Sequence, residues 1–255
     1  MTHVVAITRY ALRLAALAGL ATLFLPPPAH ATPSVNAAVI AARETIQSFA
    51  SPVPSPTVTC AAHSTALIVR WEITSPAVYQ RRYQGVIWPG GASGPTWAVG
   101  YDGGHQTRQT ITADWATHPQ VTSLSMTSGV TGPTAKLLLP QLAHVRTPYP
   151  MAVQAFSQAS LPSYRAAARR ALGAQPFDAL PCGAQAALDS LGYNRGWQMT
   201  GPRRAEMRAI RDICVPARDT HCIATQLRAM KRLWPDVKGL RDRRDDEAAY
   251  AERTI

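Results

Sequence analysis

Apolar residues recur three and four positions apart through most of the chain after residue 130, which is the spacing of helices with one buried face. The pattern predicts helices over residues 131–143, 151–158, 163–172, 181–193, 203–214, 221–233 and 240–252. A shorter helix is predicted over 61–71, where Leu67, Ile68 and Trp71 fall on one side. This helix presents Glu72 near its C-terminal end.

Residues 78–104 have a different pattern. Aromatic and β-branched residues are frequent there, and Pro/Gly/Ser-rich turns at 89–91 and 93–95 divide them. Such a segment predicts a small β-hairpin or a three-stranded sheet. The order of helix, small sheet and then many helices predicts an α+β, mostly helical fold, with a small sheet lobe and a larger helical lobe.

The beginning of the chain predicts a targeting segment. Arg9 and Arg13 precede an apolar run at 14–25, and prolines with Ala29-His30-Ala31 follow it. This order is typical of a signal peptide, here residues 1–31, which directs a protein to the periplasm or the exterior. About a dozen apolar residues are few for a membrane span, and an uncleaved anchor is the alternative.

The rest of the chain divides at a proline-rich stretch. Residues 32–58 are predicted to form an N-terminal arm, with a helix over 34–49 and a Pro/Ser-rich linker over 51–57. The main domain then extends over residues 59–255, a length that suits one domain. We expect a monomer.

The chain is strongly basic, with a formal net charge of +11. A basic surface attracts polyanions. The interleaved arginine and aromatic residues of a nucleic-acid-binding module are not evident, so the anionic bacterial wall is the favoured partner of an exported protein. The pair Arg203-Arg204 and the run at 241–244 are candidates for contacts with the wall. Salt bridges along helix faces are the simpler role for these residues.

The cysteine count is even, and all four cysteines follow the proposed signal peptide: Cys60, Cys182, Cys214 and Cys222. An even number in an exported chain predicts disulfides, and the absence of CxxC spacing argues against a metal site. Three pairings are open from sequence alone. The short loop between Cys214 and Cys222 favours their pairing at modest entropic cost, which leaves Cys60 for Cys182.

Three side chains in the first half of the domain suggest glycoside hydrolysis. This reaction commonly uses two carboxyl groups, one in an apolar setting as the proton donor and one in a polar setting. Glu72 has apolar neighbours, whereas Asp102 follows a strand among glycines, with Thr96 on a preceding strand. We expected those glycines to let a sugar chain approach the backbone. The alternative is a salt bridge of Glu72 with Arg70 or Arg81 and a turn capped by Asp102.

Four ordered motifs between residues 60 and 252 are more specific. They are EITSPAVY at 72–79, WPGGASGPT at 88–96 with VGYDGG at 99–104, LDSLGYNRG at 188–196 and GLRDRRDDE at 239–247. Together they resemble the pesticin-type branch of the phage lysozymes, which are similar to glycoside hydrolase family 24. Members carry a glutamate after a short helix, then a segment like SGxTIGxGYDxG, an aromatic-Asn-x-Gly turn and a closing GLxxRRxxE helix.

The resemblance implies a lysozyme-like fold over residues 59–255 and a muramidase without a cofactor. By position, Glu72 is the general acid, and Thr96 and Asp102 hold the attacking water with inversion at the anomeric carbon. Trp97-Ala98-Val99 stands where the family has Ile-Gly-Ile, and Pro95 replaces a β-branched residue. Both departures affect the shape of the cleft rather than the three reacting groups.

Candidate substrate contacts lie around these motifs. Ser93, Tyr101 and Asn194 carry groups that bind sugar hydroxyls or acetamido groups, although Asn194 also suits a helix C-cap. Peptidoglycan is the expected substrate, and an immunity or inhibitor protein is a further candidate partner. Two alternatives to a muramidase are distinguishable. An inactive wall-binding protein of the same fold would not lyse walls. A basic nucleic-acid-binding protein would not be exported.

Overall fold

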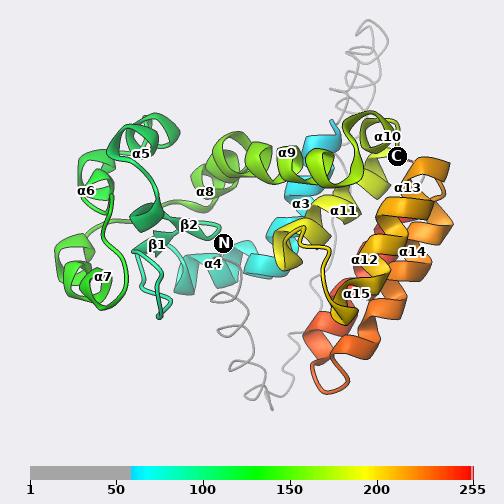
Figure 1. Ribbon diagram of the computed structural model, residues 1–255. Helices are drawn as coiled ribbons and strands as arrows, with labels where there is room; N and C mark the ends of the chain where they lie inside the picture. Colours follow the sequence, from blue (N-terminus) through cyan, green and yellow to red (C-terminus); the bar gives the residue numbers. More distant parts are fainter. Residues whose placement is uncertain (1–58, 254) are drawn as a thin grey trace, which may run out of the picture. The chain divides into compact units, whose positions relative to one another are not determined.

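A computed structural model describes residues 59–253 and 255. The predicted signal peptide at 1–31 and the arm at 32–58 lie outside these residues. The described part belongs to one compact unit, in which helices predominate and one small antiparallel sheet is present (Figure 1). The prediction of an α+β, mostly helical fold is therefore confirmed at this level.

Helix α3, Cys60–Ile73, begins where the sequence supplies a cap. The Thr59 side chain accepts a hydrogen bond from the amide of Ala62, which satisfies one of the free N–H groups of the first turn. The helix ends at Thr74, whose positive φ of 70° is unusual for a β-branched residue and turns the chain sharply. Glu72 therefore lies in the last turn of α3, as predicted.

The second helix corrects the sequence prediction, which placed sheet from residue 78 onward. Residues Pro76–Arg82 form helix α4, with Ser75 as its cap and Pro76 in its first turn. Proline suits this position because its missing N–H would have no partner in the helix. Tyr79 is consequently a buried residue of a helix, and its hydroxyl donates to the carbonyl oxygen of Thr147.

The sheet itself is smaller than predicted. Strands β1, Thr96–Trp97, and β2, Tyr101–Asp102, pair antiparallel, so that Thr96 is opposite Asp102. An isolated bridge joins Ile87 to Thr96 in place of a third strand. Ala98 in the connecting turn has a φ of 53°, a left-handed conformation that disfavours any side chain.

Short helices complete the sheet lobe and enclose an aromatic core. Three of them, at 103–105, 108–114 and 121–125, were not predicted, because their sequences are short and largely polar. The elements are η1, Gly103–His105; α5, Arg108–Asp114; α6, Val121–Ser125; α7, Pro133–Leu138; and η2, Leu139–Leu142. Trp97, Tyr101 and Trp115 pack on one another in this core, with ring centroids 4.9 to 5.6 Å apart.

A continuous helical segment joins the two lobes. It consists of α8, Tyr149–Ala155, a π-helical turn η3, Phe156–Ser160, and α9, Leu161–Leu172. The π turn contains one residue more per turn than an α-helix needs and marks the point where α8 and α9 meet. The sequence pattern predicted two separate helices here, over 151–158 and 163–172.

The helical lobe packs around a second and larger core. Its elements are α10, Ala174–Asp178; α11, Cys182–Arg195; η4, Pro202–Arg204; α12, Ala205–Ala209; η5, Ile210–Cys214; α13, Val215–Ala217; α14, Thr220–Ala229; η6, Met230–Leu233; and α15, Lys238–Ala251. Helix α11 is buried along most of its length and packs against α3 and α15. The predicted helices are present here, although 203–214 is divided into several types of turn and α10 was not predicted.

Two disulfides tie these elements together. Cys60 at the start of α3 is bonded to Cys182 at the start of α11, and Cys214 is bonded to Cys222 across the α13–α14 connection. The pairing favoured by loop length is confirmed. Disulfides of this kind are typical of an oxidising compartment. In the part of the chain that the structure describes, no helix is long and apolar enough to cross a membrane.

Candidate active site

Glu72 is held at the end of α3 by an arginine far away in the sequence. Nη1 of Arg243 in α15 donates to Oε1 of Glu72 at 2.8 Å, and the two side chains are only 5% and 12% exposed. The proposed alternative partners are not used: Arg70 pairs with Asp246 instead, and no ion pair joins Glu72 to Arg81 among the described residues. A buried ion pair of this geometry fixes the position of the carboxyl group.

Arg243 is itself part of a buried polar network on α15. Its Nε donates to Glu247, and its Nη2 donates to the hydroxyl of Ser190 in α11. Arg244 donates to the same Oε1 of Glu247 at 2.8 Å. Burial alone would lower the pKa of Arg243, but the carboxylates of Glu72 and Glu247 outweigh it, so that its pKa lies above the ordinary value.

Two tyrosines complete the surroundings of Glu72. Burial raises the pKa of Tyr193 well above its ordinary value, and the charge of Glu72 adds to this effect. Burial also raises the pKa of Tyr164, again with a contribution from Glu72. The Tyr164 and Tyr193 rings pack with centroids 4.7 Å apart. Glu72 thus lies in a mostly apolar and aromatic setting with one cation.

An apolar cluster brings the hairpin to the end of α3. Val99, in the turn between β1 and β2, is buried in the same cluster as Ile68 and Ile73 of α3 and Tyr193 of α11. Ala98 packs against this cluster from the same turn. The hairpin that carries Thr96 and Asp102 and the helix that carries Glu72 therefore contribute side chains to the same apolar cluster.

Asp102 is held by backbone amides. The amide of Gly94 donates to both of its carboxylate oxygens, at 3.0 and 3.1 Å, and the amide of Gly104 donates to Oδ1 at 3.1 Å. His105 lies farther, with Nε2 3.8 Å from Oδ2. The capping role considered from the sequence is thus real, because Asp102 caps the 3₁₀ turn η1. The two N–H donors, one of which is shared between both oxygens, suit a carboxylate and fix its orientation.

Thr96 is the neighbour of Asp102 across the sheet. The two residues are register partners, so their side chains lie on the same face. Thr96 is buried, and its hydroxyl donates to the carbonyl oxygen of Gly94 at 3.1 Å. This donation leaves the lone pairs of Oγ1 available to accept a hydrogen bond from a third group.

The glycines around Asp102 serve the fold rather than an approaching sugar, which corrects the sequence interpretation. A Cβ on Gly94 would meet Gly104 Cα at 2.4 Å, and one on Gly104 would meet the carbonyl oxygen of Val130 at 2.2 Å. A Cβ on Gly103 would meet Thr127 and Trp97. These glycines allow backbone segments of the protein to touch each other.

The three candidate substrate contacts have different positions. Tyr101 is buried in the aromatic core, and its hydroxyl donates to Asp114 at 2.7 Å, so its position supports packing rather than a sugar contact. Ser93 lies in the half-exposed turn before Gly94, and its carbonyl oxygen accepts from Trp88 and Gly132. Asn194 is within α11, and Gly196 takes the C-cap position instead.

Sequence reasoning missed Arg243 as the partner of Glu72. The arginine pair at 243–244 was assigned to salt bridges along the face of its own helix, and this is true of its bonds to Glu247. The bond to Glu72 spans 171 residues and depends on the packing of α15 beside α3. The only sequence feature that pointed to Arg243 was the resemblance of its helix to the family's closing GLxxRRxxE helix.

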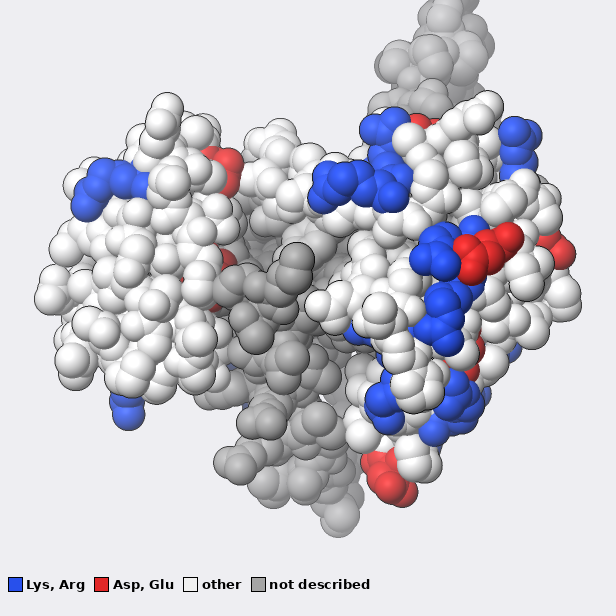
Figure 2. All heavy atoms as spheres, viewed as in Figure 1, with Lys and Arg blue, Asp and Glu red and all other residues white. Residues whose placement is uncertain are grey.

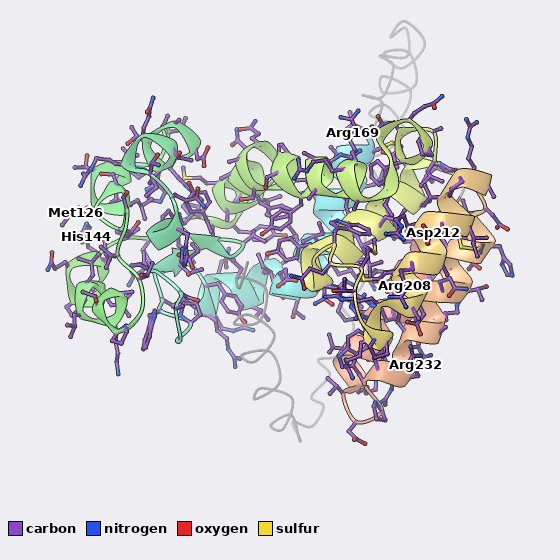
Figure 3. All side chains as sticks on the ribbon, in the orientation of Figure 1. Met126, His144, Arg169, Arg208, Asp212 and Arg232 are labelled. Atoms are coloured by element: carbon purple, nitrogen blue, oxygen red, sulfur yellow. A yellow bond between two sulfur atoms is a disulfide. The ribbon has the colours of Figure 1, made fainter. Side chains whose placement is uncertain are left out.

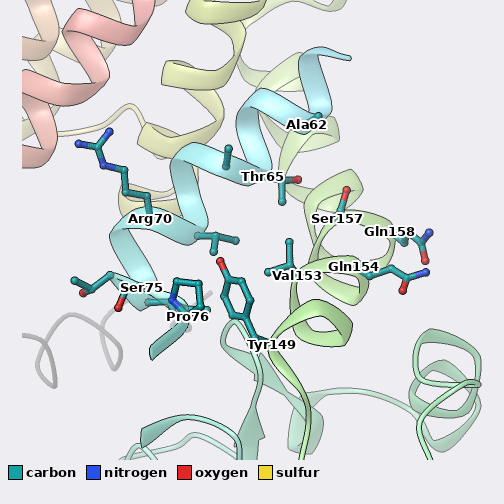
Figure 4. Close-up of a pocket in the computed structure, with 14 residues that line it drawn as sticks. Ala62, Thr65, Arg70, Ser75, Pro76, Tyr149, Val153, Gln154, Ser157 and Gln158 are labelled. Atoms are coloured by element: carbon teal, nitrogen blue, oxygen red, sulfur yellow. The ribbon is translucent and has the colours of Figure 1, made fainter. Parts of the chain in front are cut away.

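A cavity is present elsewhere on α3. It has a volume of about 570 Å³ and is lined by residues of α3, α4, α8 and η3, including Thr65, Val69, Tyr149 and Val153 (Figure 4). Glu72, Thr96 and Asp102 do not line it. Among the described residues, no group of three or more His, Cys, Asp or Glu side chains is arranged to hold a metal ion.

No model of a known protein family matches this chain, and no curated protein is significantly similar to it.

Proposed function

We propose that this chain is a peptidoglycan muramidase with a lysozyme-like fold, which hydrolyses the β-1,4 bond between N-acetylmuramic acid and N-acetylglucosamine. The observation that carries the proposal is that two differently held carboxyl groups lie on elements that share one apolar cluster. Glu72 is largely buried and bonded to Arg243, and Asp102 is fixed by backbone amides.

Each group has a defined part in the proposed reaction. Glu72 donates its proton to the glycosidic oxygen as the bond from that oxygen to the anomeric carbon breaks. A water bound between Asp102 and Thr96 attacks the anomeric carbon from the opposite face, and its proton passes to Asp102. Both the free carboxylate edge of Asp102 and the lone pairs of Thr96 Oγ1 suit such a water, and the configuration inverts.

Arg243 has a positioning role in this scheme. Its bond to Glu72 holds the carboxyl group in one rotamer, while Glu247 and Ser190 hold Arg243. The same ion pair would also suit the alternative, a wall-binding protein without activity, since a carboxylate bound to arginine is not by itself a proton donor. An activity measurement separates the two.

The deciding experiment is lysis of purified walls by the folded protein and by Glu72→Gln. The glutamine keeps the size of the side chain and can still accept from Arg243, so the fold should persist. Loss of the acid should lower the rate by at least about 100-fold. Mass analysis of the released muropeptides should show a reducing N-acetylmuramic acid end. Anhydro sugars or free peptides would instead show a transglycosylase or an amidase.

A further inference from the structure

Four arginines gather where α11 ends and η4–α12 begins. These are Arg195, Arg203, Arg204 and Arg208, here called the arginine cluster. The helical lobe bears most of the lysines and arginines seen in Figure 2, whereas the sheet lobe shows few charges on that face. Figure 3, in the same orientation, places Arg208 on that charged face.

The guanidinium groups of the arginine cluster are fixed by carbonyl oxygens. Arg195 donates to the carbonyl of Arg203 at 2.8 Å, and Arg204 donates back to the carbonyl of Arg195 at 2.7 Å. Arg203 donates to the carbonyl of Leu233 at 3.1 Å. Arg208 donates to two carbonyls of the preceding loop, at 2.8 and 2.9 Å. The side chains are thus ordered without being neutralised.

Other arginines of the lobe are arranged differently. Arg169, Arg211, Arg228 and Arg232 each form an ion pair with a carboxylate. No described carboxylate lies within ion-pair distance of the arginine cluster. Among the described residues, the pattern therefore separates arginines in ion pairs from a group of four that form none, although the charge of the more distant Glu206 still favours the charged form of Arg195.

This concentration of charge has an electrostatic cost. Burial, and then the charges of Arg204, Arg244 and Arg203, lower the pKa of Arg195 to about 10. Burial and the charge of Arg203 also lower the pKa of Arg204. An anion bound at this place would relieve the repulsion among the arginines, which gives it a favourable interaction beyond its own hydrogen bonds.

The arginine cluster is connected to the proposed active site through two neighbouring residues. Arg243 holds Glu72, and the next residue, Arg244, donates to Oδ1 of Asn194 at 3.2 Å. Arg195 follows Asn194, and its guanidinium carbon lies 4.8 Å from the ring centre of Trp234. Arg244 is paired with Glu247, but the Nε and Nη1 atoms of this fully buried side chain have no hydrogen-bond partner among the described residues.

We propose that the arginine cluster is a subsite for the carboxylates of the acidic peptides that peptidoglycan carries on its glycan strands. This inference rests on the proposed function, because it takes the substrate at Glu72 to be a glycan whose ionised groups are those peptide carboxylates. Arginine suits them, since its planar fork matches a carboxylate with two hydrogen bonds.

The test measures binding to insoluble walls in a Glu72→Gln background, so that the walls stay intact. The first variant combines Arg203→Gln with Arg208→Gln, because Arg203 is exposed and neither side chain donates to another member of the arginine cluster. The control combines Arg170→Gln with Arg218→Gln, which removes the same charge elsewhere on the lobe. Each protein is added to native walls and to walls whose carboxylates have been converted to neutral amides.

The subsite predicts a difference only on the native walls. There the Arg203/Arg208 variant should bind about three- to tenfold more weakly than its parent, while the control should stay within about twofold. On amidated walls all three proteins should bind alike. Equal loss by both pairs of substitutions, or a difference that persists on amidated walls, would overturn the proposal.

Two further outcomes have defined meanings. A loss of binding to duplex DNA by the Arg203/Arg208 variant, with unchanged binding to walls, would identify a nucleic-acid surface and refute the subsite. If the protein without substitutions fails to lyse walls but discriminates native from amidated material through Arg203 and Arg208, the muramidase proposal fails and the subsite stands. Failure of the two ideas is therefore distinguishable.

Discussion

Arg243 Nη1 lies 2.8 Å from Glu72 Oε1, and both side chains are almost removed from solvent. The pair joins the last turn of the first described helix to the middle of the last one. Removing one member would leave its partner charged and buried, which costs far more than the loss of an exposed ion pair.

We therefore expect Arg243→Ala to lower the free energy of unfolding by about 3–5 kcal/mol. Denaturant unfolding followed by circular dichroism measures this. Arg228→Ala is the matched control, because Arg228 forms an exposed ion pair with Glu252, and its removal should cost less than about 1 kcal/mol. Equal losses in the two variants would show that the Glu72 pair is not stabilising the fold.

Asp102→Asn should affect turnover and stability together. Both carboxylate oxygens of Asp102 accept from backbone amides. The asparagine has only one acceptor oxygen, so the loss of accepted hydrogen bonding should cost about 1 kcal/mol. If Asp102 also accepts the proton of the attacking water, kcat should fall while KM and wall binding change little. A parallel loss of binding and turnover would assign Asp102 a structural role alone.

The two disulfides should differ in their contribution to stability. Cys60–Cys182 spans 122 residues and Cys214–Cys222 spans 8. By the chain-entropy relation, the long bridge stabilises by about 5 kcal/mol and the short one by about 2.5 kcal/mol. Pairwise substitution by alanine, with thermal unfolding as the readout, tests this order. An equal or larger effect of the short bridge would contradict it.

Stability should depend on pH through Asp189. Burial raises the pKa of Asp189 to about 6, although Arg165 and Ser64 act in the other direction. Its Oδ1 has no hydrogen-bond partner. Because the folded protein then holds a proton that the unfolded chain releases at lower pH, this group makes stability fall as pH rises from about 4 to about 6.

The measurement is the difference between the protein and Asp189→Asn across that pH range. The asparagine should remove a dependence of up to about 3 kcal/mol, the value of two pKa units. Burial lowers the pKa of His118, so this residue affects the pH dependence of stability in the opposite sense. It contributes equally to both proteins and cancels. An unchanged profile in Asp189→Asn would place the titration elsewhere.

Ala98→Gly should stabilise the protein. Ala98 has a φ of 53° in the hairpin turn, where glycine has no side chain to clash. The relief is partly offset by the flexibility of glycine in the unfolded chain, so we expect a gain of up to about 1 kcal/mol. Ala166→Gly in the middle of α9 is the control and should lose about 1 kcal/mol. A lower melting temperature in both variants would contradict the expectation.

The sequence indicated those features that depend on local chemistry. The position of Glu72 near a helix end followed from the apolar spacing of Leu67, Ile68 and Trp71. The pairing of Cys214 with Cys222 followed from the short loop between them. These features require only neighbours along the chain, and the resemblance to lysozymes added the order of the motifs.

Features that depend on competition between signals were harder to predict. The aromatic content around Tyr79 suggested a strand, but the Ser75-Pro76 start signal prevailed and formed α4. The glycines at 103 and 104 suggested access for a ligand, whereas the fold uses them for contacts with Trp97 and Val130. Local composition does not show whether the atoms close to a glycine belong to a ligand or to another part of the same chain.

The π turn between α8 and α9 has a consequence for the angular phase of the connecting segment. An α-helix advances by about 100° per residue, so the number of residues in this turn sets the rotation of one helix about the axis of the other. Exchanging the exposed Gln158 for another residue leaves that phase unchanged. Deleting it would remove the extra residue that the π turn accommodates, so that α8 and α9 would continue as one regular α-helix. The count of residues from Phe156 to Ser160, more than their identity, therefore sets how α8 and α9 meet.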